Sequence, residues 1–208
     1  AAKQKLTLDN DDFNFLINKG TLSQFLIATG ERQLPKSFVS GEIIHIQNLD
    51  FFLKYGNEFT ITMHGRLPVI FENCTFNSKL SIQTISPKRL EFTEVTFNEN
   101  VELVNDIEVL YFNRCTNENH TIKLTGSVRV DFQLSDCAFN YFVSPAHNLK
   151  SHSITKSSLN TLIITTSSNV SSGININQVK SDLISFENGK YLMIITIEDC
   201  PFIKHISF

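Results

Sequence analysis

The chain has 208 residues, a formal net charge of −3 and 41% hydrophobic residues, among them 18 phenylalanines. A compact chain of this length buries roughly 70% of the surface that it exposes when unfolded, so it can form a core without disulfides or metals. This composition excludes a disordered chain, and the slight negative charge disfavours a nucleic-acid partner. No apolar run approaches the ~18 residues of a membrane span, so no membrane-spanning helix is expected.

Residues 1–37 are predicted to form an N-terminal helical cap. A first helix should begin near Asp11, after an Asp9 or Asn10 that can accept its first free amides, and should end at Gly20. Its apolar residues recur three and four positions apart, at Phe13, Leu16 and Ile17. A second helix with the same spacing is predicted between Thr21 and Gly30. Together the two helices would cover the open end of a core.

From residue 38 to residue 208 the chain repeats a short motif about every 21 residues. The clearest copy is Phe71-Glu-Asn-Cys-Thr-Phe-Asn, and its cysteine serves as the anchor of the repeat. The eight anchors are Leu49, Cys74, Val95, Cys115, Cys137, Ser157, Val179 and Cys200. All eight residues three before an anchor are apolar: Ile46, Phe71, Phe92, Phe112, Leu134, Ile154, Ile176 and Ile197. None of the residues one before an anchor is apolar. Each copy therefore places apolar and polar residues at the same positions.

The apolar residues alternate with polar ones, which is the periodicity of β-strands. Each copy therefore holds about three short strands that polar corners join. One such copy cannot bury its inner face alone, but copies stacked at ~4.8 Å close a continuous core. The sequence thus predicts an all-β solenoid, a parallel β-helix of about eight rungs over residues 38–208, beneath the helical cap.

In its period and in the chemistry of its columns, this stretch resembles the right-handed parallel β-helix proteins of pectin-lyase-like architecture. The resemblance is one of architecture only. A leucine-rich-repeat solenoid is the alternative, because Phe71-x-x-Cys74-x-Phe76 also fits its consensus and the periods overlap. The repeats show no helical segment, which favours the β-helix.

The cysteines and asparagines also fall into columns. The four cysteines share the anchor column, which indicates small buried hydrophobic residues, and their spacing indicates no zinc site; no cofactor or metal is expected. Free thiols slightly favour the cytoplasm, but the start at Ala1-Ala2 leaves secretion after processing open.

Three residues after the anchors, asparagines recur at Asn77, Asn98, Asn140 and Asn160, where we expect a hydrogen-bonded ladder in left-handed turns.

Charges of alternating sign precede successive anchors, at Glu94, Arg114 and Asp136. Ion pairs between neighbouring rungs would explain them. The catalytic alternative is a polysaccharide lyase or glycoside hydrolase. It would use Glu94 and Asp136 as carboxylates two rungs, or roughly 9.6 Å, apart, with Arg114 between them. Tyr111 faces outward nearby and could contact sugar.

The interpretation that the sequence favours is a non-catalytic β-solenoid that binds another macromolecule. A protein partner, a second copy of the chain and a glycan are all open. Toxin-neutralising or effector proteins of bacteria, surface adhesins and self-polymerising rods are examples. The last rung is apolar and no cap is predicted for it, so Phe202, Ile206 and Phe208 are candidate binding residues, as is Tyr111.

Overall fold

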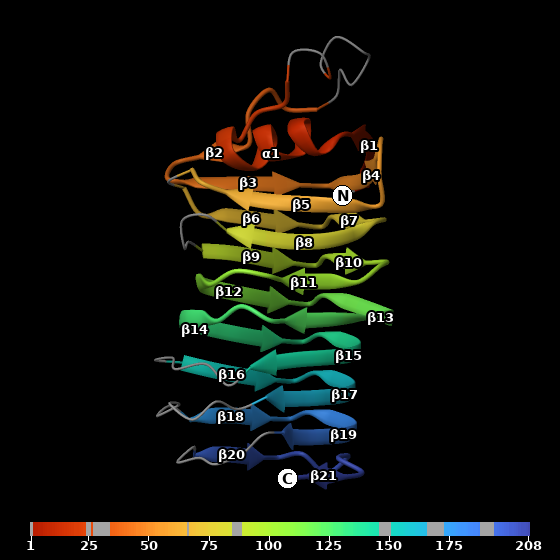
Figure 1. The fold of residues 1–208 in the computed structure, drawn as a ribbon, viewed down its shortest axis with the longest axis vertical. Helices are drawn as coiled ribbons and strands as arrows, with labels where there is room; N and C mark the ends of the chain where they lie inside the picture. The colour runs from red at the N-terminus through yellow and green to blue at the C-terminus, as the bar shows by residue number, and fades with distance from the viewer. Residues whose placement is uncertain are drawn as a thin grey trace.

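A computed structural model describes residues 2–23, 26, 34–65, 67–84, 89–145, 151–165, 173–187 and 194–208. The chain is a right-handed parallel β-solenoid of about seven turns, with the cap above its first rung (Figure 1). This confirms the predicted architecture and the resemblance to β-helix proteins. Strands line both sides of every turn, and the described part of residues 38–208 contains no helix, so the leucine-rich-repeat alternative is wrong.

The strands form two sheets that face each other across the core. The nine-stranded sheet stacks β2 (Val39–Ser40), β3 (Ile43–Gln47), β6 (Val69–Glu72), β9 (Arg89–Thr93), β12 (Ile107–Asn113), β14 (Val128–Ser135), β16 (Ser151–Thr155), β18 (Ile174–Asn177) and β20 (Ile195–Glu198). All its pairs are parallel except the β2–β3 hairpin.

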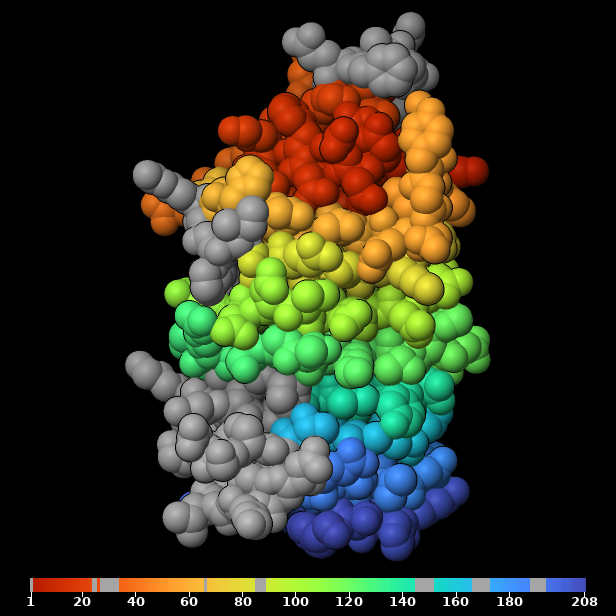
Figure 2. Space-filling model, in the orientation of Figure 1, coloured from red at the N-terminus to blue at the C-terminus, as the bar shows by residue number. Residues whose placement is uncertain are grey.

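The twelve-stranded sheet contains β1 (Gln4–Leu8), β4 (Leu49–Leu53), β5 (Glu58–Met63), β7 (Thr75–Phe76), β8 (Lys79–Thr84), β10 (Thr96–Phe97), β11 (Val101–Leu103), β13 (Thr116–Leu124), β15 (Ala138–Pro145), β17 (Ser158–Thr165), β19 (Lys180–Glu187) and β21 (Ile206–Ser207). The first rungs divide this side into two short strands, whereas the later rungs use a single long one. In the space-filling view, the described residues form successive bands down the column (Figure 2).

The predicted register is confirmed strand by strand. Phe71 pairs with Phe92, and Phe92 with Phe112, in the parallel nine-stranded sheet. Their rings stack at centroid distances of 5.6 and 5.3 Å. The same column continues through Leu134 and Ile154, and all these side chains are buried. One pile of like residues therefore forms the core.

The left-handed corners lie in a different column from the one predicted. Positive φ angles occur one residue before the anchors, at Asn48, Asn73, Glu94, Arg114, Asp136, Lys156, Gln178 and Asp199. The backbone amides of these residues still hydrogen-bond within the nine-stranded sheet. The amide of Glu94, for example, donates to the carbonyl of Asn113 at 2.8 Å. The chain then turns into the other sheet. The asparagine ladder itself is present, because Asn98 donates to Asn77 at 2.9 Å, but its members do not adopt the left-handed conformation.

The first helix of the cap, α1 (Asn10–Lys19), is confirmed. Asp9 accepts the amide of Asp12 at 2.9 Å, and Gly20 ends the helix with φ 69°. A Cβ at Gly20 would meet the Val39 side chain at 2.6 Å, so both conformation and space require glycine there. The predicted second helix lies mostly outside the described residues. The cap also contains a strand that was not predicted, β1, which pairs in parallel with β4.

Helix α1 closes the edge of β5 through three asparagines spaced four residues apart. The side-chain oxygens of Asn10, Asn14 and Asn18 accept the backbone amides of Thr60, Thr62 and His64 at 2.7 to 2.9 Å. Their side-chain amides donate to the carbonyls of Glu58, Thr60 and Thr62 at 2.6 to 2.9 Å. The helix therefore satisfies the main-chain groups that a neighbouring strand would otherwise pair.

Candidate interaction surfaces

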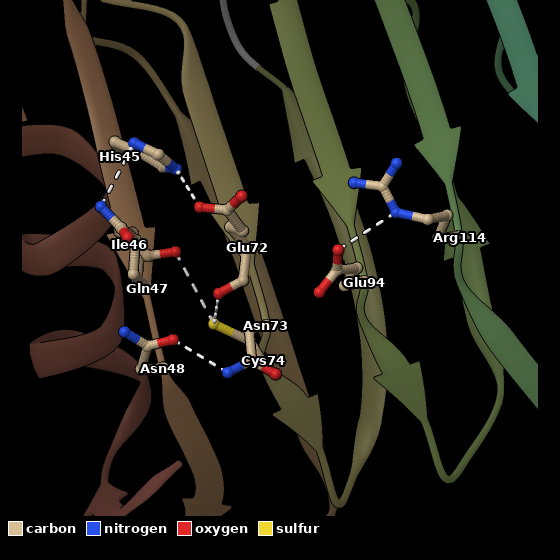
Figure 3. Close-up of polar contacts among 9 residues, drawn as sticks. All are labelled: His45, Ile46, Gln47, Asn48, Glu72, Asn73, Cys74, Glu94 and Arg114. Atoms are coloured by element: carbon tan, nitrogen blue, oxygen red, sulfur yellow. Dashed lines mark hydrogen bonds and ion pairs between the residues drawn. The ribbon is translucent and has the colours of Figure 1, made fainter. Parts of the chain in front are cut away.

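The corner charges lie on the rim where the two sheets meet. Arg114 Nε lies 3.1 Å from Glu94 Oε1, and the two side chains are 51% and 49% exposed (Figure 3). Asp136 accepts a hydrogen bond from its neighbour Ser135 at 3.3 Å. The structure thus joins Glu94 to Arg114 as an ion pair in contact with water, which has little effect on stability.

Tyr111 is the centre of a cluster on the outer face of the nine-stranded sheet. Its hydroxyl donates to the carboxylate of Asp131, and the Arg89 guanidinium lies over its ring at 5.0 Å. Arg89 also pairs with Glu91 at 3.0 Å, and Gln133 donates to Asp131 at 3.1 Å. Burial, helped by the bond to Asp131, raises the pKa of the Tyr111 hydroxyl to about 12. These contacts hold the ring in one orientation.

Sequence reasoning singled out Tyr111 but missed Arg89 and Asp131, the two residues that hold its ring. Arg89 and Asp131 both lie six residues before an anchor, and both pair with Val109 between them. Arg89 and Asp131 therefore lie on the two strands that flank β12, and from there both side chains can reach Tyr111, two residues along that strand. Applying the repeat period to this position would have found the contact.

Below Tyr111 the outer face carries two columns of uncharged polar side chains. Pairing aligns Tyr111 with Gln133, Ser153, Asn175 and Thr196 in the first column. The second column contains Thr93, Asn113, Ser135, Thr155 and Asn177, and the charged Glu198 follows it in the last rung. We call these two columns the polar face. Its members repeat at the sheet spacing of ~4.8 Å along the solenoid axis.

The last rung exposes the apolar residues that the sequence singled out. Phe202 is 67% exposed and Phe208 87% exposed, and Ile206 lies at the edge beside them. The Phe208 ring also stacks on Phe186 at 5.2 Å, which ties the segment to the rung above. In the described structure β20 pairs only with β18 and β21 only with β19, so each presents one open edge.

All four cysteines are free thiols, and three of them are buried, as the anchor column predicts. Within the described residues, no three potential ligands gather to hold a metal ion. Nor does that part of the chain include a helix long and apolar enough to cross a membrane.

The described geometry defines a class: a capped, right-handed parallel β-solenoid with a flat polar outer face. Comparison with known protein families, with curated proteins and with solved structures gave no match for this chain. Its function must therefore be argued from its own surfaces.

Proposed function

We propose that this chain is a non-catalytic interaction module that binds an extended glycan along the polar face. The observation that carries the proposal is the alignment of two uncharged polar columns over successive rungs below Tyr111. Amide and hydroxyl groups can both donate and accept hydrogen bonds, as sugar hydroxyls do. A rigid sheet holds them at a constant spacing, so a polymer parallel to the axis would meet the same groups at each step.

The Tyr111 cluster supports the same function. An aromatic side chain held by Arg89 and Asp131 loses little conformational freedom on binding. Arg89 pairs with Glu91, and Asp131 accepts hydrogen bonds from Tyr111 and Gln133. Because these charged groups are already engaged, hydrogen bonding by the polar columns is the main means of recognition. Toxin neutralisation, effector action and adhesion could each use such a face, and a neutral face best supports adhesion to a glycan.

The catalytic alternative has weaker support. Glu94 and Arg114 neutralise each other and stay half exposed, so water is not excluded from the carboxylate. General acid catalysis by a carboxyl group needs a shielded setting that raises its pKa. Binding without reaction is the simpler role for this surface.

A second candidate function is protein binding at the last rung. Phe202 and Phe208 are exposed there beside the open edges of β20 and β21. An extended strand of another protein, or of a second copy of this chain, could add to these edges while apolar side chains cover the rings. Light scattering over a range of concentrations, with Phe202→Ser as the variant, would test self-association.

Calorimetry with soluble oligosaccharides that span several rungs tests the glycan proposal. The probes are linear oligomers of glucose, of mannose and of N-acetylglucosamine. We expect at least one to bind, and Tyr111→Ala to weaken it tenfold or more. Tyr141→Ala is the matched control, because Tyr141 faces outward from β15 on the other sheet. Failure of every oligomer to bind, or equal loss in both variants, would contradict the proposal.

A further inference from the structure

A recess of about 450 Å³ lies where the cap meets the outer face of the first rungs. Pockets that bind small ligands usually measure about 300 to 1,000 Å³, so this one can hold a small molecule. Its position matters because His45 and Gln47 line it from β3. Pairing places His45 in the column of Tyr111, and Gln47 in the column of Asn113. The recess therefore lies in line with the two columns of the polar face, with Ile70, Glu72 and Glu91 between them.

Both apolar and polar side chains line the recess. The apolar ones come from Leu34, Pro35, Phe38 and Val39. The polar ones, which we call the polar wall, come from Gln4, His45, Gln47 and Asn48. A ligand that fits must therefore present both apolar surface and hydrogen-bonding groups. A pyranose ring has this character, with C–H groups on its faces and hydroxyls around its edge.

The polar wall is already oriented. His45 Nε2 lies 3.0 Å from a Glu72 carboxylate oxygen, and the Gln47 amide lies 3.3 Å from His45 Nδ1 (Figure 3). Asn73 donates to the side-chain oxygen of Asn48 at 2.8 Å. These bonds engage Gln47 Nε2 and Asn48 Oδ1. Within the described residues they leave Gln47 Oε1 as an acceptor and Asn48 Nδ2 as a donor without a partner.

The charge of the lining decides the ligand class. No lysine, arginine, aspartate or glutamate is among the described residues that line the recess. An anion would need a cationic partner, and a metal ion would need carboxylates. His45, the ionisable side chain among these residues, already pairs with Glu72 at 3.0 Å. The described lining therefore best fits an uncharged ligand that carries both donors and acceptors.

We propose that this recess binds an uncharged sugar unit, and that it thereby receives the end of the glycan bound along the polar face. The link to a longer glycan rests on the proposed function, whereas binding of a single sugar in the recess does not. Recognition of a chain end would set the direction in which the polymer lies.

NMR with methyl glycosides of glucose, mannose, galactose and N-acetylglucosamine tests the site, with glucuronate and glucosamine as charged comparisons. We expect one neutral sugar to bind with a Kd on the order of millimolar and to shift the amide resonances of residues 37–48. Gln47→Leu should weaken it at least tenfold, and Ser40→Trp should block the recess by filling it. Gln83→Leu, an outward glutamine on β8, is the matched control and should change nothing.

Three outcomes would overturn the inference: no neutral sugar binds, a charged sugar binds equally well, or the shifts fall outside residues 37–48. Thermal melting of each variant shows whether it is folded. Tyr111→Ala separates the two proposals, because it should lower oligosaccharide binding and leave the single sugar unaffected. If oligomers bind through Tyr111 but no single sugar enters the recess, only the inference fails. If a sugar enters the recess and no oligomer needs Tyr111, the polar-face proposal fails instead.

Discussion

The side-chain oxygen of Asn14 accepts the backbone amide of Thr62 at 2.7 Å, so a helix side chain occupies the place of a neighbouring strand. Asn10 and Asn18 do the same one turn before and after it. The edge of β5 is thereby closed to other chains. Among the described residues, no helix side chains bond to the edges of β20 and β21 in this way.

Asn14→Ala should lower the free energy of unfolding by about 2 to 3 kcal/mol, because it removes the partners of the Thr62 amide and the Thr60 carbonyl. Urea denaturation followed by circular dichroism measures the change. Asn57→Ala, at an exposed position after β4, is the control and should stay within about 0.5 kcal/mol. Equal effects of the two substitutions would show that the asparagine contacts do not stabilise the cap.

Phe92→Ala should be strongly destabilising, by about 3 to 5 kcal/mol, because Phe92 is fully buried between Phe71 and Phe112. The cavity cannot close without shifting the rungs on both sides. Phe15→Ala on the outer side of α1 is the control, since Phe15 is an exposed phenylalanine. Thermal unfolding of the two variants gives the comparison, and a small loss for Phe92→Ala would contradict the single stacked core.

His152 should make stability depend on pH. Burial lowers the pKa of its imidazole to about 4, against an ordinary value near 6.5. As pH falls from 6.5 to 4, the unfolded chain takes up a proton that the folded chain does not, so the free energy of unfolding should fall by up to about 3 kcal/mol.

His152→Leu should remove this contribution and match the apolar residues that occupy the same column in the other rungs. The measurement is the difference between wild type and variant in urea denaturation at pH 7 and at pH 4.5. At pH 4.5 the free energy of unfolding of the wild type should have fallen relative to that of the variant, compared with pH 7. If it is the same at both values, the imidazole does not titrate as its burial requires.

Lys156→Asn should stabilise the fold by about 0.5 to 1 kcal/mol. Lys156 has φ 50°, a left-handed conformation that asparagine adopts more readily than lysine. Lys123→Asn, at an exposed position within β13, is the control and should be neutral or destabilising, because asparagine is disfavoured in strands. A loss of stability in Lys156→Asn would contradict the assignment of this column to the corners.

The sequence alone was enough to determine the solenoid, its period and its inner columns. Each rung repeats the same constraint, so Phe71, Phe92 and Phe112 reinforce one another and a shift of one residue would expose all of them. The first helix was also predictable, because its cap at Asp9 and its end at Gly20 are local signals.

Contacts between distant segments were decided only by the tertiary structure. Two polar columns flank each corner, and their composition does not reveal that Glu94 rather than Asn98 takes the left-handed conformation. The asparagines of α1 have a partner only once β5 lies beside them, and Arg89 reaches Tyr111 only once β9 and β12 are paired. The recess likewise exists only where the cap meets β3. Periodicity encodes which side of a strand faces the core, but it carries no information about which separate segments meet at the surface.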